Sequence, residues 1–396
     1  MEQLQLVLLF ATGFLISRVM VKTRLPQKLV LIMMGNSHNS LSLTLLYLLT
    51  TAATVSLFIP NAITMLTLLP VLDLLNRTFT NRTSKVPTML TLAVLYGSNI
   101  GGMGSITGTP TNMVLVGYLS AHNVPGVENI TFLSWLMWGI PLVIVIIAAA
   151  WIILCVSFNA WQADAEQVHI PFAPEETEHP LQLQALGILL FYIIFAALLS
   201  YLLMVFPECA IEVVALTAII IAGLTWYLFL YPTSSGRPFL LISDAYSDLP
   251  IGGLKWIAIV LTLVGLVYAM GIQIWINHYT KLLIPHGTSP FIFLLTAALI
   301  TTFATEVLSN TMVQIAMFVV MLPIVQTMGL SPIQTLLAIT LTCTCTFMTP
   351  IATPVNALAF GSTKDVSVLH FMGVGAIMNL VSALLITAYV LNFVNW

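Results

Sequence analysis

Two short polar patterns recur in the two halves of the chain, and their residue types suit the binding of a small anion and a cation. Residues 108–112 (Gly-Thr-Pro-Thr-Asn) recur as residues 352–356 (Ala-Thr-Pro-Val-Asn), 244 positions later. Asn61 recurs as Asn310, 249 positions later. The similar offsets predict an internal duplication, with one copy of the same binding arrangement in each half.

The Thr-Pro pairs in these patterns predict helix starts, because threonine is a good N-cap and proline suits the first helical position. Thr109-Pro110 and Thr353-Pro354 therefore indicate two helices that break inside the membrane and restart. Asn61 and Asn310 are likewise expected to cap the second arm of a hairpin. Four helix N-termini would then offer N–H groups to an anion, and the opposing carbonyl ends would suit a hard cation such as Na⁺.

Two further features surround these patterns. The glycine-rich run 97–104 is expected to loosen the first break, so that backbone can approach a ligand closely. Glu306 lies one turn before Asn310, and an ionisable group at membrane depth is a functional candidate, here as a coupling group. The alternative for Glu306 is a carboxylate beside a water-filled vestibule, hydrogen-bonded to neighbouring hydroxyls.

The composition places the chain in a bilayer. Of 396 residues, 59% are hydrophobic and 6% are charged, whereas soluble domains carry about 25% charged residues. Apolar stretches such as 132–158 and 183–206 can cross roughly 30 Å of hydrocarbon as helices. The alternation of a barrel is absent, no basic stripe suits nucleic acid, and no nucleophile and base pair suits an enzyme.

Basic residues form two groups that predict the topology. One group follows residues 4–21 and the other follows residues 41–75, and basic loops face the cytoplasm. Residues 41–75 therefore cross an even number of times, which favours a re-entrant hairpin with its tip near Asn61 over two skewed full spans. The two groups are Arg18, Lys22, Arg24 and Lys28, and Arg77, Arg82 and Lys85.

The remaining apolar stretches complete an all-α plan of two repeats. The first repeat, 1–158, has a helix, the hairpin 41–75, a broken helix 88–120 and a helix 132–158. A polar linker, 159–182, leads to the second repeat, 183–396, with three helices, a hairpin 290–327, a broken helix 333–361 and a helix 370–392. The hairpins are expected to enter from opposite faces of the cell (inner) membrane, with both chain termini outside. Such inverted repeats are typical of secondary transporters.

At these residues the chain resembles the divalent anion sodium symporter (DASS) family of the ion transporter superfamily. That family carries a Ser-Asn-Thr tip in each hairpin and a Thr-Pro-x-Asn break in the following helix. Residues 305–311 and 352–356 are similar to the second pair, and residues 56–62 and 108–110 correspond in the first half. The resemblance covers nearly the whole chain.

The resemblance implies an elevator-type carrier of di- or tricarboxylates, usually a homodimer, with Na⁺ as the coupling ion and no other cofactor. It implies one Na⁺ site at Ser56, the Pro60 carbonyl, Asn61 and Gly108, and a second at Thr305, the Leu308 carbonyl, Asn310 and Ala352. Substrate carboxylates are expected to meet Asn61, Thr109, Pro110, Ser309, Asn310, Thr311, Thr353 and Pro354.

The chain also departs from the family pattern. Pro60 and Ala62 stand where the family has Ser and Thr, so the first tip lacks two hydroxyls and one backbone donor. Family members also carry about three further helices before the segment matching residues 4–21, which implies an incomplete first-half scaffold. Three alternatives to Na⁺-coupled symport remain: an anion exchanger, a proton-coupled carrier using Glu306, and a non-transporting member that needs a partner.

Overall fold

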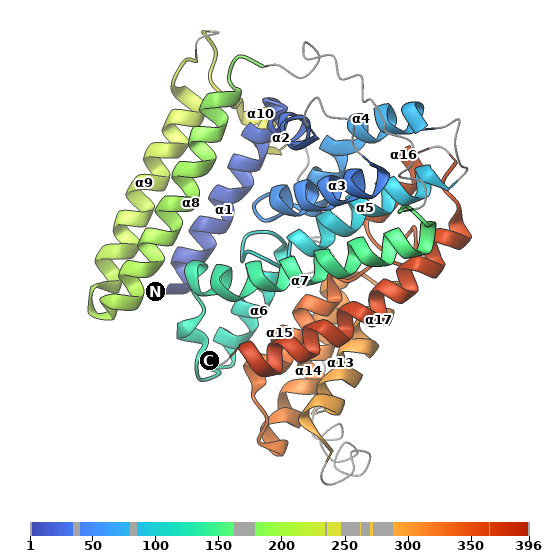
Figure 1. The fold of residues 1–396 in the computed structure, drawn as a ribbon. Coiled ribbons are helices and arrows are strands. Elements are labelled where there is room, and N and C mark those ends of the chain that lie inside the picture. Colours follow the sequence, from blue (N-terminus) through green and yellow to red (C-terminus); the bar gives the residue numbers. More distant parts are fainter. Residues whose placement is uncertain are drawn as a thin grey trace.

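The protein is an all-helical, multi-pass membrane protein, as its composition predicts (Figure 1). The computed structural model describes residues 2–34, 40–79, 85–161, 179–233, 236–246, 288–363 and 365–394, together with 262, 270 and 271. All regular structure in these residues is helical. Six of the described helices are long and apolar enough to cross a membrane: Leu4–Lys22, Phe132–Phe158, Gln182–Val205, Pro207–Leu230, Asn310–Met328 and Val368–Phe393.

The helices before the polar linker are long where the sequence is uniformly apolar and short where it is interrupted. They are α1 (Glu2–Lys22), α2 (Leu25–Met34), α3 (Leu41–Ser56), α4 (Asn61–Phe79), α5 (Val86–Gly101), α6 (Pro110–Ala121), the 3₁₀ turn η1 (Val127–Asn129) and α7 (Phe132–Phe158). A capping box at Thr131 and Ser134 starts α7, and Asn159, in the left-handed conformation, ends it.

The helices after the linker follow a similar order. They are α8 (Gln182–Val205), the 3₁₀ turn η4 (Pro207–Cys209), α9 (Ala210–Leu230), α10 (Ile242–Tyr246), α13 (Pro290–Thr305), α14 (Asn310–Met328), α15 (Pro332–Cys343), α16 (Pro354–Ser362) and α17 (Val368–Phe393). Most of the linker 159–182 and nearly all of the expected span 253–276 lie outside the described residues.

Two helical hairpins have the same dimensions. The pair α3 and α4 has 16 and 19 residues, as does the pair α13 and α14, and all four helix bounds repeat 249 positions later. A 16-residue helix is roughly 24 Å long, too short to cross the hydrocarbon upright. In Figure 1 the outer ends of α3 and α4 lie at the upper right, whereas those of α13 and α14 lie at the bottom.

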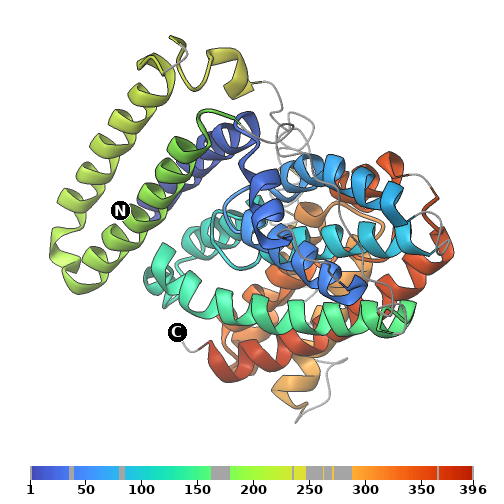
Figure 2. The ribbon, with the colours of Figure 1, turned by 45° about the horizontal axis from the view of Figure 1, so that its top comes forward.

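The remaining long helices form two groups around the hairpins. α1, α8 and α9 pack on one another as a layer at one side of the molecule, visible in both views (Figures 1 and 2). α7 and α17 pack side by side across the body that contains the hairpins. The short helices α5, α6, α15 and α16 lie within that body, so the first interruption, 102–109, is buried by other helices, whereas the second is half-buried to exposed over residues 348–353. Enclosure is what irregular backbone needs at membrane depth.

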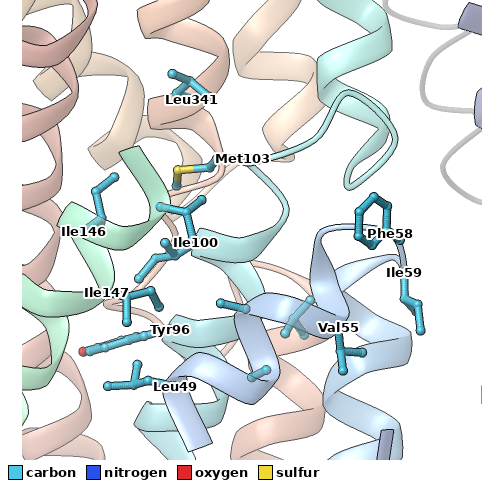
Figure 3. Close-up of a cluster of buried hydrophobic side chains, with 14 of the residues drawn as sticks. Leu49, Val55, Phe58, Ile59, Tyr96, Ile100, Met103, Ile146, Ile147 and Leu341 are labelled. Atoms are coloured by element: carbon cyan, nitrogen blue, oxygen red, sulfur yellow. The ribbon is translucent and has the colours of Figure 1, made fainter. Parts of the chain in front are cut away.

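Part of the apolar core lies beside the first hairpin, between α3, α5 and α7. Figure 3 shows Tyr96 of α5 between Leu49 of α3 and Ile147 of α7, with Ile100 one turn further along α5 beside Ile146. All five side chains are buried. This core anchors the helix that leads into the first break.

Small residues let α3 and α5 approach until their backbones touch. A Cβ on Gly97 would lie 2.6 Å from the Leu49 carbonyl oxygen, and one on Gly101 would lie 2.3 Å from the Ala53 carbonyl oxygen. Glycine spaced by four residues is typical of close helix pairs in membranes. The first hairpin is thereby held directly against the helix that carries the first break.

Replacing Gly101 with alanine is expected to destabilise the protein by about 1–3 kcal/mol, because the added methyl group overlaps backbone that cannot move aside. Thermal denaturation of the detergent-purified variant measures this. Gly223→Ala in α9 is the control, since a Cβ there meets nothing within 4 Å. Equal melting temperatures for the two variants would refute the backbone contact.

Candidate functional site

The two breaks, residues 102–109 between α5 and α6 and residues 344–353 between α15 and α16, contain equivalent hydrogen bonds. Asn112 Nδ2 donates to the carbonyl oxygens of Gly102 at 2.9 Å and Ser105 at 2.8 Å. Asn356 Nδ2 donates to the carbonyl oxygens of Thr346 at 2.9 Å and Thr349 at 2.7 Å. Donors and acceptors all correspond at the offset of 244 positions. Each asparagine therefore holds its break in shape by pairing carbonyls that no helix satisfies.

The helix starts predicted at the Thr-Pro pairs are confirmed, since α6 begins at Pro110 and α16 at Pro354. Thr353 caps α16, with its hydroxyl accepting from the Asn356 N–H at 3.2 Å. Thr109 occupies the N-cap position with extended backbone but makes no side-chain cap bond. Its hydroxyl instead lies 3.3 Å from the Thr111 hydroxyl.

The expected capping role of Asn61 and Asn310 is wrong. Each is the first residue of its helix, and Ser309 holds the N-cap position of α14 without a side-chain bond. The Asn61 amide is used elsewhere, because its Oδ1 accepts from Ser56 Oγ at 2.9 Å and its Nδ2 donates to Asn99 Oδ1 at 3.3 Å. These bonds hold the hairpin tip on the first break.

Oxygen atoms converge in the first half around two glycines. A Cβ on Gly108 would lie 2.7 Å from the Gly102 carbonyl oxygen and 3.0 Å from the Ser56 carbonyl oxygen. A Cβ on Gly102 would lie 2.5 Å from Asn61 Oδ1. The structure thus brings together Ser56, Asn61 and Gly108 of the first expected set. Neutral carbonyl and amide oxygens are suitable ligands for a hard monovalent cation.

The second half contains the corresponding residues, but the side-chain oxygen of its asparagine is in a different hydrogen-bonding state. Asn310 Oδ1 is buried and has no hydrogen-bond partner. Thr305 is fully buried and its hydroxyl donates to the Thr302 carbonyl oxygen at 2.8 Å. No hydrogen bond of the described chain joins Thr305, Leu308, Asn310 and Ala352 to one another. A buried amide oxygen without a donor is a costly group that a bound cation would satisfy.

Glu306 is a buried carboxylate surrounded by donors. It is 2% exposed. Its Oε1 accepts from the Met348 N–H at 2.8 Å and from Asn379 Nδ2 at 2.7 Å. Its Oε2 accepts from the Thr349 N–H at 2.7 Å and lies 2.9 Å from the Thr349 hydroxyl. The carboxylate therefore ties the α13–α14 tip to the second break and to α17.

The first half makes the corresponding contact without charge. Leu57 stands 249 positions before Glu306, and Gly104 stands 244 positions before Met348. A Cβ on Gly104 would lie 2.4 Å from Leu57 Cδ2, so this leucine packs directly on the first break. Trp135, 244 positions before Asn379, donates from Nε1 to the Met103 carbonyl oxygen at 2.9 Å. Both tips are thus fixed to their breaks, one by packing and one by a carboxylate.

Polar side chains also join the two halves at the breaks. Asn99 Nδ2 donates to the Thr346 carbonyl oxygen at 3.3 Å. Gln314 Nε2 donates to the Thr111 carbonyl oxygen at 2.8 Å. The sequence patterns did not single out Asn99, Thr346 or Gln314, nor Asn379. Asn99 is the one amide in the glycine-rich run 97–104, a signal that could have found it.

The two half-sites differ in exposure. Beside the first tip and break, Phe58 is 8% and Thr107 is 4% exposed, whereas the corresponding Val307 is 82% and Ile351 is 86% exposed. The layer of α1, α8 and α9 contacts the first break, since a Cβ on Gly13 of α1 would lie 3.6 Å from Thr107 Cβ. Of the expected substrate contacts, Pro110, Ser309 and Pro354 are exposed and Thr311 and Thr353 are half-buried.

Hairpin tips set on interrupted helices, with converging neutral oxygens inside a multi-pass helical body, define a membrane transport protein rather than an enzyme. The chain belongs to the citrate transporter family, whose model matches residues 3–230.

Relatives cover nearly the whole chain. A sodium-dependent dicarboxylate transporter of Staphylococcus saprophyticus is 26% identical, over 97% of this chain and 76% of the relative. A protein of the same name from Staphylococcus aureus strain USA300 is 28% identical, over 96% of this chain and 75% of the relative. These matches confirm the resemblance to the divalent anion sodium symporter family.

Proposed function

We propose that the protein is a Na⁺-coupled symporter of small di- or tricarboxylate anions. The observation that carries this is the convergence of the Ser56 and Gly102 carbonyls and Asn61 Oδ1 where Gly102 and Gly108 leave room. Such a cluster of neutral oxygens suits Na⁺. The relatives named as sodium-dependent dicarboxylate transporters support both the ion and the substrate class.

Two cation sites follow from this proposal. The first uses Ser56, Asn61, Gly108 and the Pro60 carbonyl, with the Gly102 carbonyl added because it faces Gly108. The second uses Thr305, Asn310, Ala352 and the Leu308 carbonyl, and the unpartnered Asn310 Oδ1 supports it. Bound Na⁺ would also supply positive charge for the substrate, because neither tip nor break contains Lys or Arg.

The substrate carboxylates would bind where hydroxyls, amides and helix starts are accessible. Ser309, Thr311 and Thr353 keep their hydroxyls in the second half, whereas the first tip has Pro60 and Ala62 instead. The helices that begin at Pro110 and Pro354 direct N–H groups and partial positive charge toward the breaks. We therefore expect more substrate contacts in the second half than in the first.

The proposed transport mechanism is an elevator built on an inverted repeat. Equal hairpin bounds at the 249 offset and equal bonds across both breaks support a duplication, and the outer ends of the hairpins lie on different sides in Figure 1. The repeats would be 1–158 and 183–396, with 159–182 between them. The proposed state is a homodimer in the cell (inner) membrane with both termini outside.

Uptake into proteoliposomes tests the function. Labelled succinate or citrate is expected to accumulate when an inward Na⁺ gradient is imposed, and to equilibrate without accumulation when choline replaces Na⁺. Accumulation that follows an outward dicarboxylate gradient instead would assign exchange, and accumulation driven by a proton gradient would assign proton coupling. Absence of uptake for both substrates under all these gradients would contradict transport of small carboxylates.

A further inference from the structure

We propose that Asn99 is a positioning residue that links Asn61 to Thr346 in the opposite half of the protein, sets the direction of the Asn61 amide, and so couples the two cation sites. The proposal rests on the Na⁺ coupling proposed above. Asn99 lies in the last turn of α5, is 2% exposed, and bonds to both halves.

The Thr346 carbonyl in the second half determines which atoms donate and which accept along the bonds from Thr346 to Asn99 and Asn61. The Thr346 carbonyl oxygen can only accept, so the atom of Asn99 that lies 3.3 Å from it must be the Nδ2 donor. Asn99 Oδ1 then faces Asn61. Because an amide oxygen also only accepts, the Asn61 atom at 3.3 Å must be Nδ2.

The consequence reaches the proposed cation site. With its Nδ2 held by Asn99, Asn61 directs Oδ1 to the other side, where it accepts from Ser56 Oγ at 2.9 Å and lies against Gly102. A flipped Asn61 would present N–H groups to the cation. Asn99 therefore keeps a cation ligand, rather than a donor, in the site.

The same carbonyl also belongs to the second break. Thr346 O accepts from Asn356 Nδ2 at 2.9 Å, and Asn356 Oδ1 accepts from the Thr353 hydroxyl at 2.7 Å. A ligand that rearranges Thr353 or the backbone of the second break changes the acceptor that orients Asn99. Occupancy of one half-site thereby alters the cation affinity of the other, which is a reciprocal coupling.

The second half has no amide at the position that corresponds to Asn99, and this supplies a matched control. The residue 244 positions after Asn99 is Cys343, which is also buried; its Sγ lies 3.0 Å from the Thr340 carbonyl oxygen of its own helix and hydrogen-bonds to the Thr111 side chain, not to Asn61 or Asn99. Cys343→Ala removes a side chain from the corresponding position without touching the link. Asn99→Leu removes both amide bonds and keeps a side chain branched at the same carbon.

The test measures the Na⁺ dependence of succinate uptake in proteoliposomes for the wild type, Asn99→Leu and Cys343→Ala. Asn99→Leu is expected to raise the half-saturating Na⁺ concentration about fivefold or more and to lower the Hill coefficient for Na⁺. The melting temperature of Asn99→Leu without Na⁺ should stay near that of Cys343→Ala. A variant that had lost its fold would instead melt at a lower temperature. Cys343→Ala should keep the wild-type Na⁺ dependence.

If Asn99→Leu does not fold, Asn99→Ser takes its place, since a serine hydroxyl is too short to bridge Asn61 and Thr346, and the same shift is expected. An unchanged Na⁺ dependence in the folded variant, with a Na⁺-dependent wild type, overturns the role of Asn99 and leaves the proposed function intact. A wild type whose uptake ignores Na⁺ overturns the proposed function and this proposal together.

Discussion

Replacing Glu306 with glutamine is expected to abolish substrate uptake at every pH and to lower the melting temperature of the protein. Each carboxylate oxygen accepts a backbone N–H, from Met348 at 2.8 Å and from Thr349 at 2.7 Å. A glutamine amide has one oxygen, so its NH₂ group must face one of these donors. The expected cost is roughly 2–4 kcal/mol, because buried donors lose charge-assisted bonds.

The same variant decides between two roles for Glu306. A proton carrier must bind a hydrogen at an oxygen, and Oε1 already accepts two N–H groups, from Met348 and Asn379, which leaves only Oε2, beside the Thr349 hydroxyl, to hold one. The geometry instead favours a structural role, in which the Glu306 carboxylate holds the hairpin tip, the second break and Asn379 together. We call this role the tie. The tie predicts loss of uptake and of thermal stability in Glu306→Gln, whereas a proton carrier predicts a stable protein whose uptake no longer responds to pH.

Uptake and melting temperature of Glu306→Gln are measured from acid to alkaline pH against Glu208→Gln. Glu208 is an exposed carboxylate in the turn between α8 and α9, so its replacement should change neither. A Glu306→Gln protein that melts like the wild type and transports independently of pH would refute the tie and restore the proton-coupled alternative.

The sequence predicted the class of fold well because hydrocarbon leaves few choices. Long apolar stretches must form helices to satisfy their backbone, and hydropathy therefore indicates a multi-pass helical protein. The helix starts at Pro110 and Pro354 were also predictable from the sequence. A threonine followed by proline favours a helix start through local backbone geometry, which does not depend on tertiary packing.

Side-chain partners were less predictable. Asn61 was expected to cap α4, but Ser56 and Asn99 both lie within reach of its amide and take it instead. Asn99 and Thr346 are 247 positions apart, so no local pattern announces their bond. The partners of Glu306 are mostly backbone N–H groups, which every residue possesses.

Replacing Gly108 with alanine is expected to reduce Na⁺ affinity by roughly 10- to 100-fold, the usual loss when the support of a metal ligand is disturbed. The new Cβ would lie 2.7 Å from the Gly102 carbonyl oxygen, 2.9 Å from Gly102 Cα and 3.0 Å from the Ser56 carbonyl oxygen. All three are backbone atoms, so the hairpin tip or the break itself must move. The atoms displaced are the oxygens proposed to bind Na⁺.

Gly117→Ala is the matched control, because Gly117 lies on α6, nine positions after Gly108, and a Cβ there meets nothing within 4 Å. In helix α6 that alanine should stabilise the protein slightly, since alanine is the better helix former. The Na⁺-dependent shift in melting temperature is measured for both variants, together with the Na⁺ dependence of uptake. A Gly108→Ala protein that keeps the wild-type Na⁺ response would place the cation elsewhere, because no cation bound by these oxygens could tolerate a methyl group among them.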